Sequence, residues 1–145
     1  MASAPVIVVG VDGSDSSIQA LVWGAKQATL TGSTLRAVAT WRWPNYLTRV
    51  PPGVDLAGET TQMLHEAVTT ALADFSELTV AEAVVDGPAG PALLTQARDA
   101  SLLVVGARGR AAFPGMLLGS VAEYCVRNGP CPVVVVRASD SAQPD

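Results

Sequence analysis

A glycine-rich segment, residues 106–120, carries residue types that suit the binding of phosphate groups. Gly106, Gly109 and Gly119 lack side chains, so the backbone there can approach a ligand closely. Backbone N–H groups can then point at phosphate oxygens, and the hydroxyl of Ser120 can donate one more hydrogen bond. If a helix follows the segment, its N-terminus adds a partial positive charge. We therefore expect this segment to hold an anion.

Three charged residues can complete such a site. Arg108 and Arg110 lie within the segment and can offset phosphate charge. Asp12 follows an early apolar run, where a carboxylate can accept hydrogen bonds from a ribose or orient a metal ion. The alternative for Asp12 is structural, because Asp before Gly often bonds its own backbone in a turn. Both interpretations of Asp12 stay open.

The elements that must position these residues follow from hydrophobic patterning. Apolar runs rich in β-branched residues alternate with segments of helical period, which indicates a parallel sheet with helices on both faces. The predicted strands are Pro5–Val11, Thr34–Trp41, Leu78–Val85, Ser101–Val105 and Val133–Val136. The predicted helices run from Ser14 or Asp15 to Gly32, over about 57–76, over 91–99, and from Leu117 or Leu118 to about Asn128.

This arrangement predicts where a ligand binds. In open α/β sheets, ligands lie beyond the carboxyl ends of the strands, where the strand order reverses. The turns at residues 10–14 and 106–110 follow the first and fourth predicted strands. If these two strands are neighbours, both turns line one crevice.

A long connection, residues 42–56, contains three prolines and a glycine. Loops of this length in compact domains are often lids or mobile segments, and the alternative is a variable surface connection. An indole from Trp41 or Trp43 could flank a bound base, although packing elsewhere is the simpler interpretation.

Composition limits the function classes. The 145 residues include nine Lys and Arg against thirteen Asp and Glu, a net charge of −4. A protein that binds nucleic acid normally carries the opposite sign, because phosphate neutralisation dominates that binding. We therefore expect no nucleic-acid partner, while an anionic ligand remains possible where local N–H donors and cations meet.

Cysteine usage and apolar run lengths favour a cytoplasmic protein. Cys125 and Cys131 have no His or Cys cluster around them, so we expect reduced, packed thiols and no zinc site. The early apolar run, residues 6–9, is too short for a signal peptide or a membrane span, and no other run is long enough. We expect no membrane partner.

The glycine-rich segment also has a specific spacing: Gly, two residues, Gly, nine residues, then Gly followed by Ser. This motif, with residues 8–14 and 131–137, resembles the universal stress protein family over nearly the whole chain. The full motif is typical of the members that bind nucleotides. One departure lies at residues 37–41, where many members carry a His.

The resemblance implies one domain over residues 1–145, with an ordered core of about 5–137. It implies a five-stranded parallel open sheet in the order 3-2-1-4-5, of the adenine-nucleotide alpha-hydrolase-like type. It also implies ATP, with Mg²⁺, as the ligand and a homodimer through strand 132–137. An apolar run at a sheet edge agrees with such a dimer, because proteins normally cover bare edges.

By match to the family, Asp12 would contact the adenosine, and the backbone of residues 38–40 would contact the adenine. The motif glycines and Ser120 would hold the phosphates. Asp12 would also be a Mg²⁺ ligand through ATP. The full predicted nucleotide site is Gly10, Val11, Asp12, Val38, Ala39, Thr40, Gly106, Arg108, Gly109, Arg110, Gly119, Ser120 and Val121.

The expected function is that of an ATP-binding regulatory protein of the stress response, with an unknown downstream protein partner and no efficient catalysis. The sequence has no Gly-Lys-Ser/Thr P-loop, and no positioned nucleophile is evident. Three alternatives stay open: a slow ATPase, autokinase or nucleotidyl transferase, a member that binds AMP or cyclic AMP, and a dimeric scaffold with an empty site.

Overall fold

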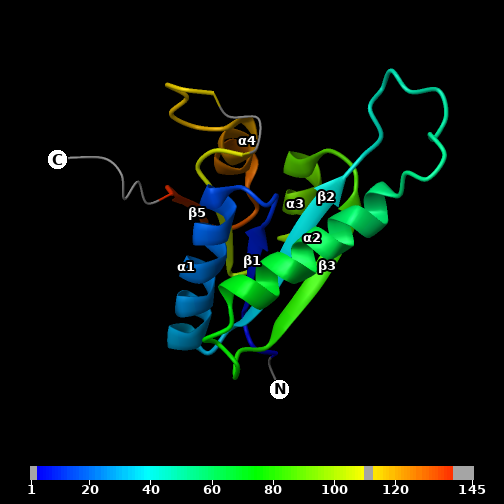
Figure 1. Ribbon diagram of the computed structural model, residues 1–145. Helices are drawn as coiled ribbons and strands as arrows, with labels where there is room; N and C mark the ends of the chain where they lie inside the picture. The colour runs from blue at the N-terminus through cyan, green and yellow to red at the C-terminus, as the bar shows by residue number, and fades with distance from the viewer. Residues whose placement is uncertain (1–2, 110–112, 139–145) are drawn as a thin grey trace.

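The computed structural model describes residues 3–109 and 113–138. Its centre is one five-stranded parallel sheet in the order β3-β2-β1-β4-β5 (Figure 1). The strands are β1 (Val6–Gly10), β2 (Thr34–Trp41), β3 (Val80–Asp86), β4 (Leu102–Gly106) and β5 (Val133–Val136). The helices are α1 (Asp15–Thr31), α2 (Leu56–Ala71), α3 (Ala89–Gln96) and α4 (Ser120–Asn128). The predicted fold class and strand order are confirmed.

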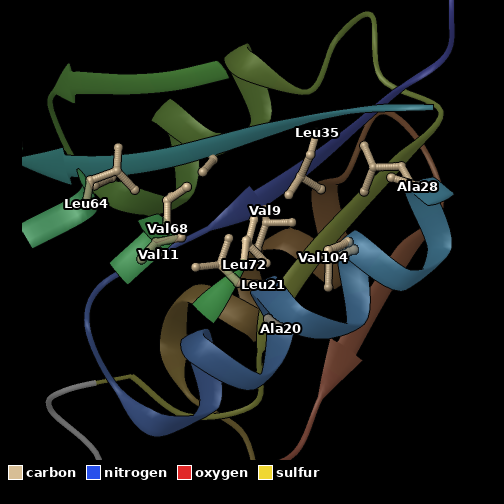
Figure 2. Close-up of a cluster of buried hydrophobic side chains, with 14 residues drawn as sticks. Val9, Val11, Ala20, Leu21, Ala28, Leu35, Leu64, Val68, Leu72 and Val104 are labelled. Atoms are coloured by element: carbon tan, nitrogen blue, oxygen red, sulfur yellow. The ribbon is translucent and has the colours of Figure 1, made fainter. Parts of the chain in front are cut away.

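The helices cover both faces of the sheet, and alternate strand residues face each layer. Ile7 and Val9 of β1 lie in a cluster beneath α1 and α2, part of which Figure 2 shows. Val8 points to the other face, where it packs with Leu93 of α3 and Cys125 of α4. Because both faces are covered, the central strands are apolar on both sides, which explains their continuous apolar runs.

Helix α1 begins and ends where its sequence signals predict. The Ser14 side chain accepts a hydrogen bond from the backbone N–H of Ser17, which caps the N-terminus. Gly32 ends the helix with a left-handed φ of 68°, and its N–H donates to the carbonyl oxygen of Ala28. The first helix is therefore fixed directly after the turn that follows β1.

Four predicted helix boundaries were wrong. Helix α2 ends at Ala71 rather than near residue 76, because turn hydrogen bonds from Phe75 N to Leu72 O and from Leu78 N to Phe75 O replace the helix. Helix α3 begins two residues earlier than predicted, at Ala89, and ends three residues earlier, at Gln96, because turn hydrogen bonds from Arg98 N to Thr95 O and from Ala100 N to Ala97 O follow it. Helix α4 begins at Ser120 rather than at residue 117 or 118, because Gly119 is extended.

Within the residues that the structure describes, every helix is too short or too polar to cross a membrane.

Candidate functional site

A cavity of about 320 Å³ opens at the carboxyl edge of the sheet, and we call it the edge cavity. Strands β1 and β4 pair directly, so the turns that follow them meet there as predicted. This volume falls in the range of small-molecule sites. The lining residues are Gly10, Val11, Asp12, Ser14, Val38, Thr40, Ala89, Leu93, Val105, Gly106, Arg108, Gly109, Met116, Gly119, Ser120, Val121 and Ala122.

The turn after β1 holds Asp12 in a defined position. One carboxylate oxygen, Oδ1, accepts a hydrogen bond of 2.9 Å from the N–H of Ser14, and Gly13 turns the chain with a φ of 84°. The Asp12 N–H also donates to the hydroxyl of Ser17, at 3.3 Å. The structural interpretation of Asp12 is therefore correct, and the same residue also lines the edge cavity.

The loop after β4 is closed at its base by one short hydrogen bond. The N–H of Gly119 donates to the carbonyl oxygen of Ala107 at 2.6 Å, which brings the end of β4 beside the start of α4. The Ser14 hydroxyl lies 3.5 Å from the carbonyl oxygen of Arg108, so the two turns also contact each other. The wall of the cavity is thus built from two turns that are far apart in the sequence.

The three motif glycines are explained by close packing within this wall. A Cβ atom on Gly106 would lie 2.6 Å from Ser16 Cβ, so only glycine lets β4 end against α1. A Cβ on Gly109 would lie 2.8 Å from Oδ2 of Asp12. A Cβ on Gly119 would lie 3.3 Å from Ala107 O and from Gly109 N. The spacing of the motif therefore reflects how tightly the two turns and α4 are joined.

The N-terminus of α4 supplies hydrogen-bond donors to the cavity. Gly119 caps this helix without a side-chain hydrogen bond, and Ser120 and Val121 of the first turn line the cavity. The N–H groups of a first helical turn carry partial positive charge and accept anions. Arg108, which is exposed, adds a full positive charge to the same wall.

The opposite part of the cavity is apolar. Val38, Leu93 and Val105 line it, and all three are almost fully buried. A Cβ on Gly10 would lie 2.9 Å from Leu93 Cδ1, so helix α3 packs directly over the end of β1. The cavity therefore joins an apolar end, which suits a planar ring, to a polar end with N–H donors and a cation.

The structure brings all but two of the predicted site residues to this cavity. Ala39 does not line it, because its side chain is buried in the cluster beneath α1 and α2. Arg110 lies outside the described residues. That the other residues bind a nucleotide stays a prediction.

Sequence reasoning missed six lining residues. They are Ser14, Ala89, Leu93, Val105, Met116 and Ala122. Ser14 was placed in the turn at residues 10–14 that was expected to line the crevice, but it was not named as a residue of the nucleotide site. Leu93 and Ala122 are ordinary core residues by type, so no signal in the sequence could have separated them from the rest of the core.

The connection between β2 and α2, residues 42–55, extends away from the sheet (Figure 1). None of its residues lines the edge cavity. In this structure the connection is therefore no lid over that cavity, and neither Trp41 nor Trp43 flanks it.

The fold and this cavity define an α/β protein with a cavity of small-molecule size at the carboxyl edge of its sheet. The sequence model of the Universal stress protein family matches residues 5–137. The chain belongs to this family, as its motif predicted.

Two relatives of Mycobacterium tuberculosis (strain ATCC 25618 / H37Rv) illustrate the similarity. Universal stress protein Rv2623 is 32% identical over 95% of this chain, and Universal stress protein Rv2005c is 33% identical over 96%. These matches cover 49% and 50% of the two relatives, so the chain spans about half of their length.

Solved structures agree with the fold. A universal stress protein in complex with cAMP is 30% identical, with a TM-score of 0.69, and the match covers 95% of this chain and 100% of that one. A universal stress protein from Archaeoglobus fulgidus in complex with dAMP is 22% identical, with a TM-score of 0.65 and coverage of 94% and 99%.

Proposed function

We propose that this chain binds an adenine nucleotide in the edge cavity and acts as a nucleotide-responsive regulatory protein of the stress response. The observation that carries the proposal is the joining of an apolar end and an anion-accepting end in one cavity. The related protein solved with cAMP supports the adenine nucleotide class.

In this proposal the phosphates lie at the end where α4 begins. The N–H groups of the first turn, the Ser120 hydroxyl and Arg108 would bind them. The base would lie at the apolar end, near Val38 and Leu93, with Thr40 at the rim.

ATP with Mg²⁺ is the form that we propose. Asp12 lines the cavity and would be the protein carboxylate nearest to the metal. Among the described residues, there is no group of three or more His, Cys, Asp or Glu side chains that could hold a metal ion. Mg²⁺ would therefore be held largely by the phosphates, which is its usual mode in nucleotide sites.

A binding role fits this site better than efficient catalysis. Oδ1 of Asp12 is already engaged by the Ser14 N–H, which limits this carboxylate as a general base. A regulatory role requires that ATP binds one state of the protein better than another. If phosphate release from ATP and Mg²⁺ reached many turnovers per second, the binding-only proposal would be wrong.

A cyclic AMP or AMP ligand is the second candidate. It is favoured by the 30% identical protein that was solved with cAMP. It is also favoured by the charges of the cavity, because Arg108 is the one lining cation among the described residues and a triphosphate carries more negative charge.

Calorimetry with ATP, AMP and cyclic AMP tests both candidates, together with mass spectrometry of nucleotide that is released from the purified protein. We expect ATP to bind most tightly in the presence of Mg²⁺. Tighter binding of cyclic AMP would select the second candidate. If no nucleotide co-purifies and none binds, the chain is a scaffold and the proposal fails.

We further propose a homodimer through strand 132–137 and a cytoplasmic location. Strand β5 lies at one edge of the sheet, and its four valines are each partly exposed. Both cysteines are free thiols, as is usual in a reducing compartment.

A further inference from the structure

A second cavity of about 440 Å³ adjoins the edge cavity, and we call it the adjoining cavity. It lies between the end of β2 and the first turns of α3 and α4. Thr40, Ala89, Ser120 and Val121 line both cavities. These four side chains are small, and they form the boundary that the two cavities share. Ser120 therefore lies where a ligand in the edge cavity could reach the adjoining cavity.

Two aromatic residues line the adjoining cavity, Trp41 at the end of β2 and Tyr124 of α4. Tyr124 lies one helical turn after Ser120, so both are on the same face of α4. A Cβ on Gly90 would lie 2.6 Å from Cδ1 and 3.0 Å from Cγ of Tyr124, so the ring packs directly on the backbone of α3. Tyr124 is nevertheless 40% exposed. The ring is thus held in place while part of its surface stays open.

The adjoining cavity also has a cation, Arg42. Arg42 directly follows Trp41, the last residue of β2, and lines the adjoining cavity. Its side chain is exposed, and it makes no ion pair within the described residues, whereas Arg36 and Arg127 are paired with carboxylates. An exposed, unpaired guanidinium beside an aromatic ring suits a phosphate attached to a base.

We propose that the full ligand is a dinucleoside polyphosphate, with one adenosine in the edge cavity and the second nucleoside in the adjoining cavity. The proposal rests on the nucleotide site described above. The phosphate chain would cross at Ser120 and meet Arg42, and the second base would stack on Tyr124. A mononucleotide would leave both the ring and the guanidinium unused.

Calorimetry on the full chain with Mg²⁺ tests this proposal with three ligands: ATP, adenosine tetraphosphate and diadenosine tetraphosphate. The last two share the tetraphosphate chain, but the second nucleoside also converts the terminal phosphate into an ester with one ionisable oxygen fewer, so a variant at the stacking residue is needed to assign the difference to the second base. We expect diadenosine tetraphosphate to bind about tenfold more tightly than adenosine tetraphosphate, as one stacked base provides.

Variants of Tyr124 test whether the tighter binding of diadenosine tetraphosphate comes from stacking on this ring. Tyr124→Ala should abolish the tenfold advantage and leave the affinity for ATP within about twofold, whereas Tyr124→Phe, which keeps the ring, should retain the advantage. Tyr46→Ala is the matched control, because Tyr46 is 82% exposed and lines neither cavity. Thermal melts would show that each variant is folded.

Equal affinity for the two tetraphosphates, or an advantage that survives Tyr124→Ala, would overturn the proposal while the mononucleotide site stands. A third result would also overturn the proposal, in favour of a subsite for phosphate alone. In that result adenosine tetraphosphate binds more tightly than ATP, Arg42→Ala removes this gain, and the second nucleoside adds nothing further. Failure of ATP itself to bind would overturn the proposed function, and the dinucleotide with it.

Discussion

Ser120 is the residue at which the phosphate hypothesis is most directly testable. It is the first residue of α4, it is exposed, and it lines the edge cavity. The motif glycines are poorer probes, because each of them is also required where two segments of the protein touch. Ser120 can be changed without disturbing those contacts.

We expect Ser120→Ala to weaken ATP binding about tenfold, since a hydrogen bond to a charged group contributes roughly 1.5–3 kcal/mol. The thermal midpoint should stay within about a degree of the wild type. Calorimetry and a thermal melt measure the two effects, and Ser76→Ala, on an exposed turn, is the control. Unchanged ATP affinity would remove Ser120 from the site.

Gly106→Ala should cost stability before it affects any ligand. The new Cβ would lie 2.6 Å from Ser16 Cβ and 2.7 Å from the Ser16 carbonyl carbon, so α1 and β4 must move apart. Overpacking of this kind costs about 1–3 kcal/mol of unfolding free energy, measurable by urea denaturation. Gly119→Ala, with its nearest contacts at 3.3 Å, should lose less. Equal free energies of unfolding for the wild type, Gly106→Ala and Gly119→Ala would contradict this account.

At the scale of elements, helix α4 serves both the site and the core. Its first turn lines the edge cavity, while Ala122 and Cys125 on its inner side are buried against the sheet. Burial raises the pKa of the Cys125 thiol from its ordinary value of 9.0 to about 11. The thiol is therefore a packed side chain rather than a reactive one.

This raised pKa predicts a pH dependence of stability. Below pH 9 the thiol is protonated in both states, and its contribution to stability is complete. Between about pH 9 and 11 the unfolded chain loses this proton first, so the free energy of unfolding should fall as the pH rises. The free energy of unfolding should fall less steeply with pH in Cys125→Ala than in the wild type, because the two proteins differ only in this thiol and share all other titrating groups. Urea denaturation from pH 8 to 11 compares the two slopes, and parallel slopes would refute the prediction.

At the scale of the whole molecule, the open edge of β5 is the surface that a second copy would use. The carbonyl oxygens of Pro132 and Val136 accept hydrogen bonds from β4 and the loop that follows it. Backbone groups alternate in direction along a strand, so those of Val133 and Val135 point away from the sheet. These outward groups, with the partly exposed valines, can pair with another strand.

Val135→Pro should convert the proposed dimer into a folded monomer, because it removes one outward N–H and leaves the ladder to β4 intact. Light scattering coupled to size exclusion measures the mass, and circular dichroism checks the fold. Val134→Pro is the contrasting variant, since its N–H faces β4 and its loss should reduce stability. A dimer that persists in Val135→Pro, or a wild type that is monomeric at high concentration, would exclude this interface.

The sequence by itself determined the parallel sheet, its order through the family resemblance, and the glycine-rich turn. Those features depend on local patterning: continuous apolar strands, helical periods, and glycines at positions where larger residues cannot fit. Helix ends were less predictable, because the start of α4 is set by the hydrogen bond between Gly119 and Ala107 rather than by local preference.

Only the tertiary structure decided which ordinary residues surround the ligand space. Leu93 has no distinctive type and reaches the edge cavity because α3 packs over Gly10. Tyr124 and Arg42 are far apart in sequence, and they share the adjoining cavity because α4 and β2 both pack against α3. Such neighbours arise from how helices and strands pack against one another across the sheet. The local pattern of residue types along the sequence does not show which distant residues come together.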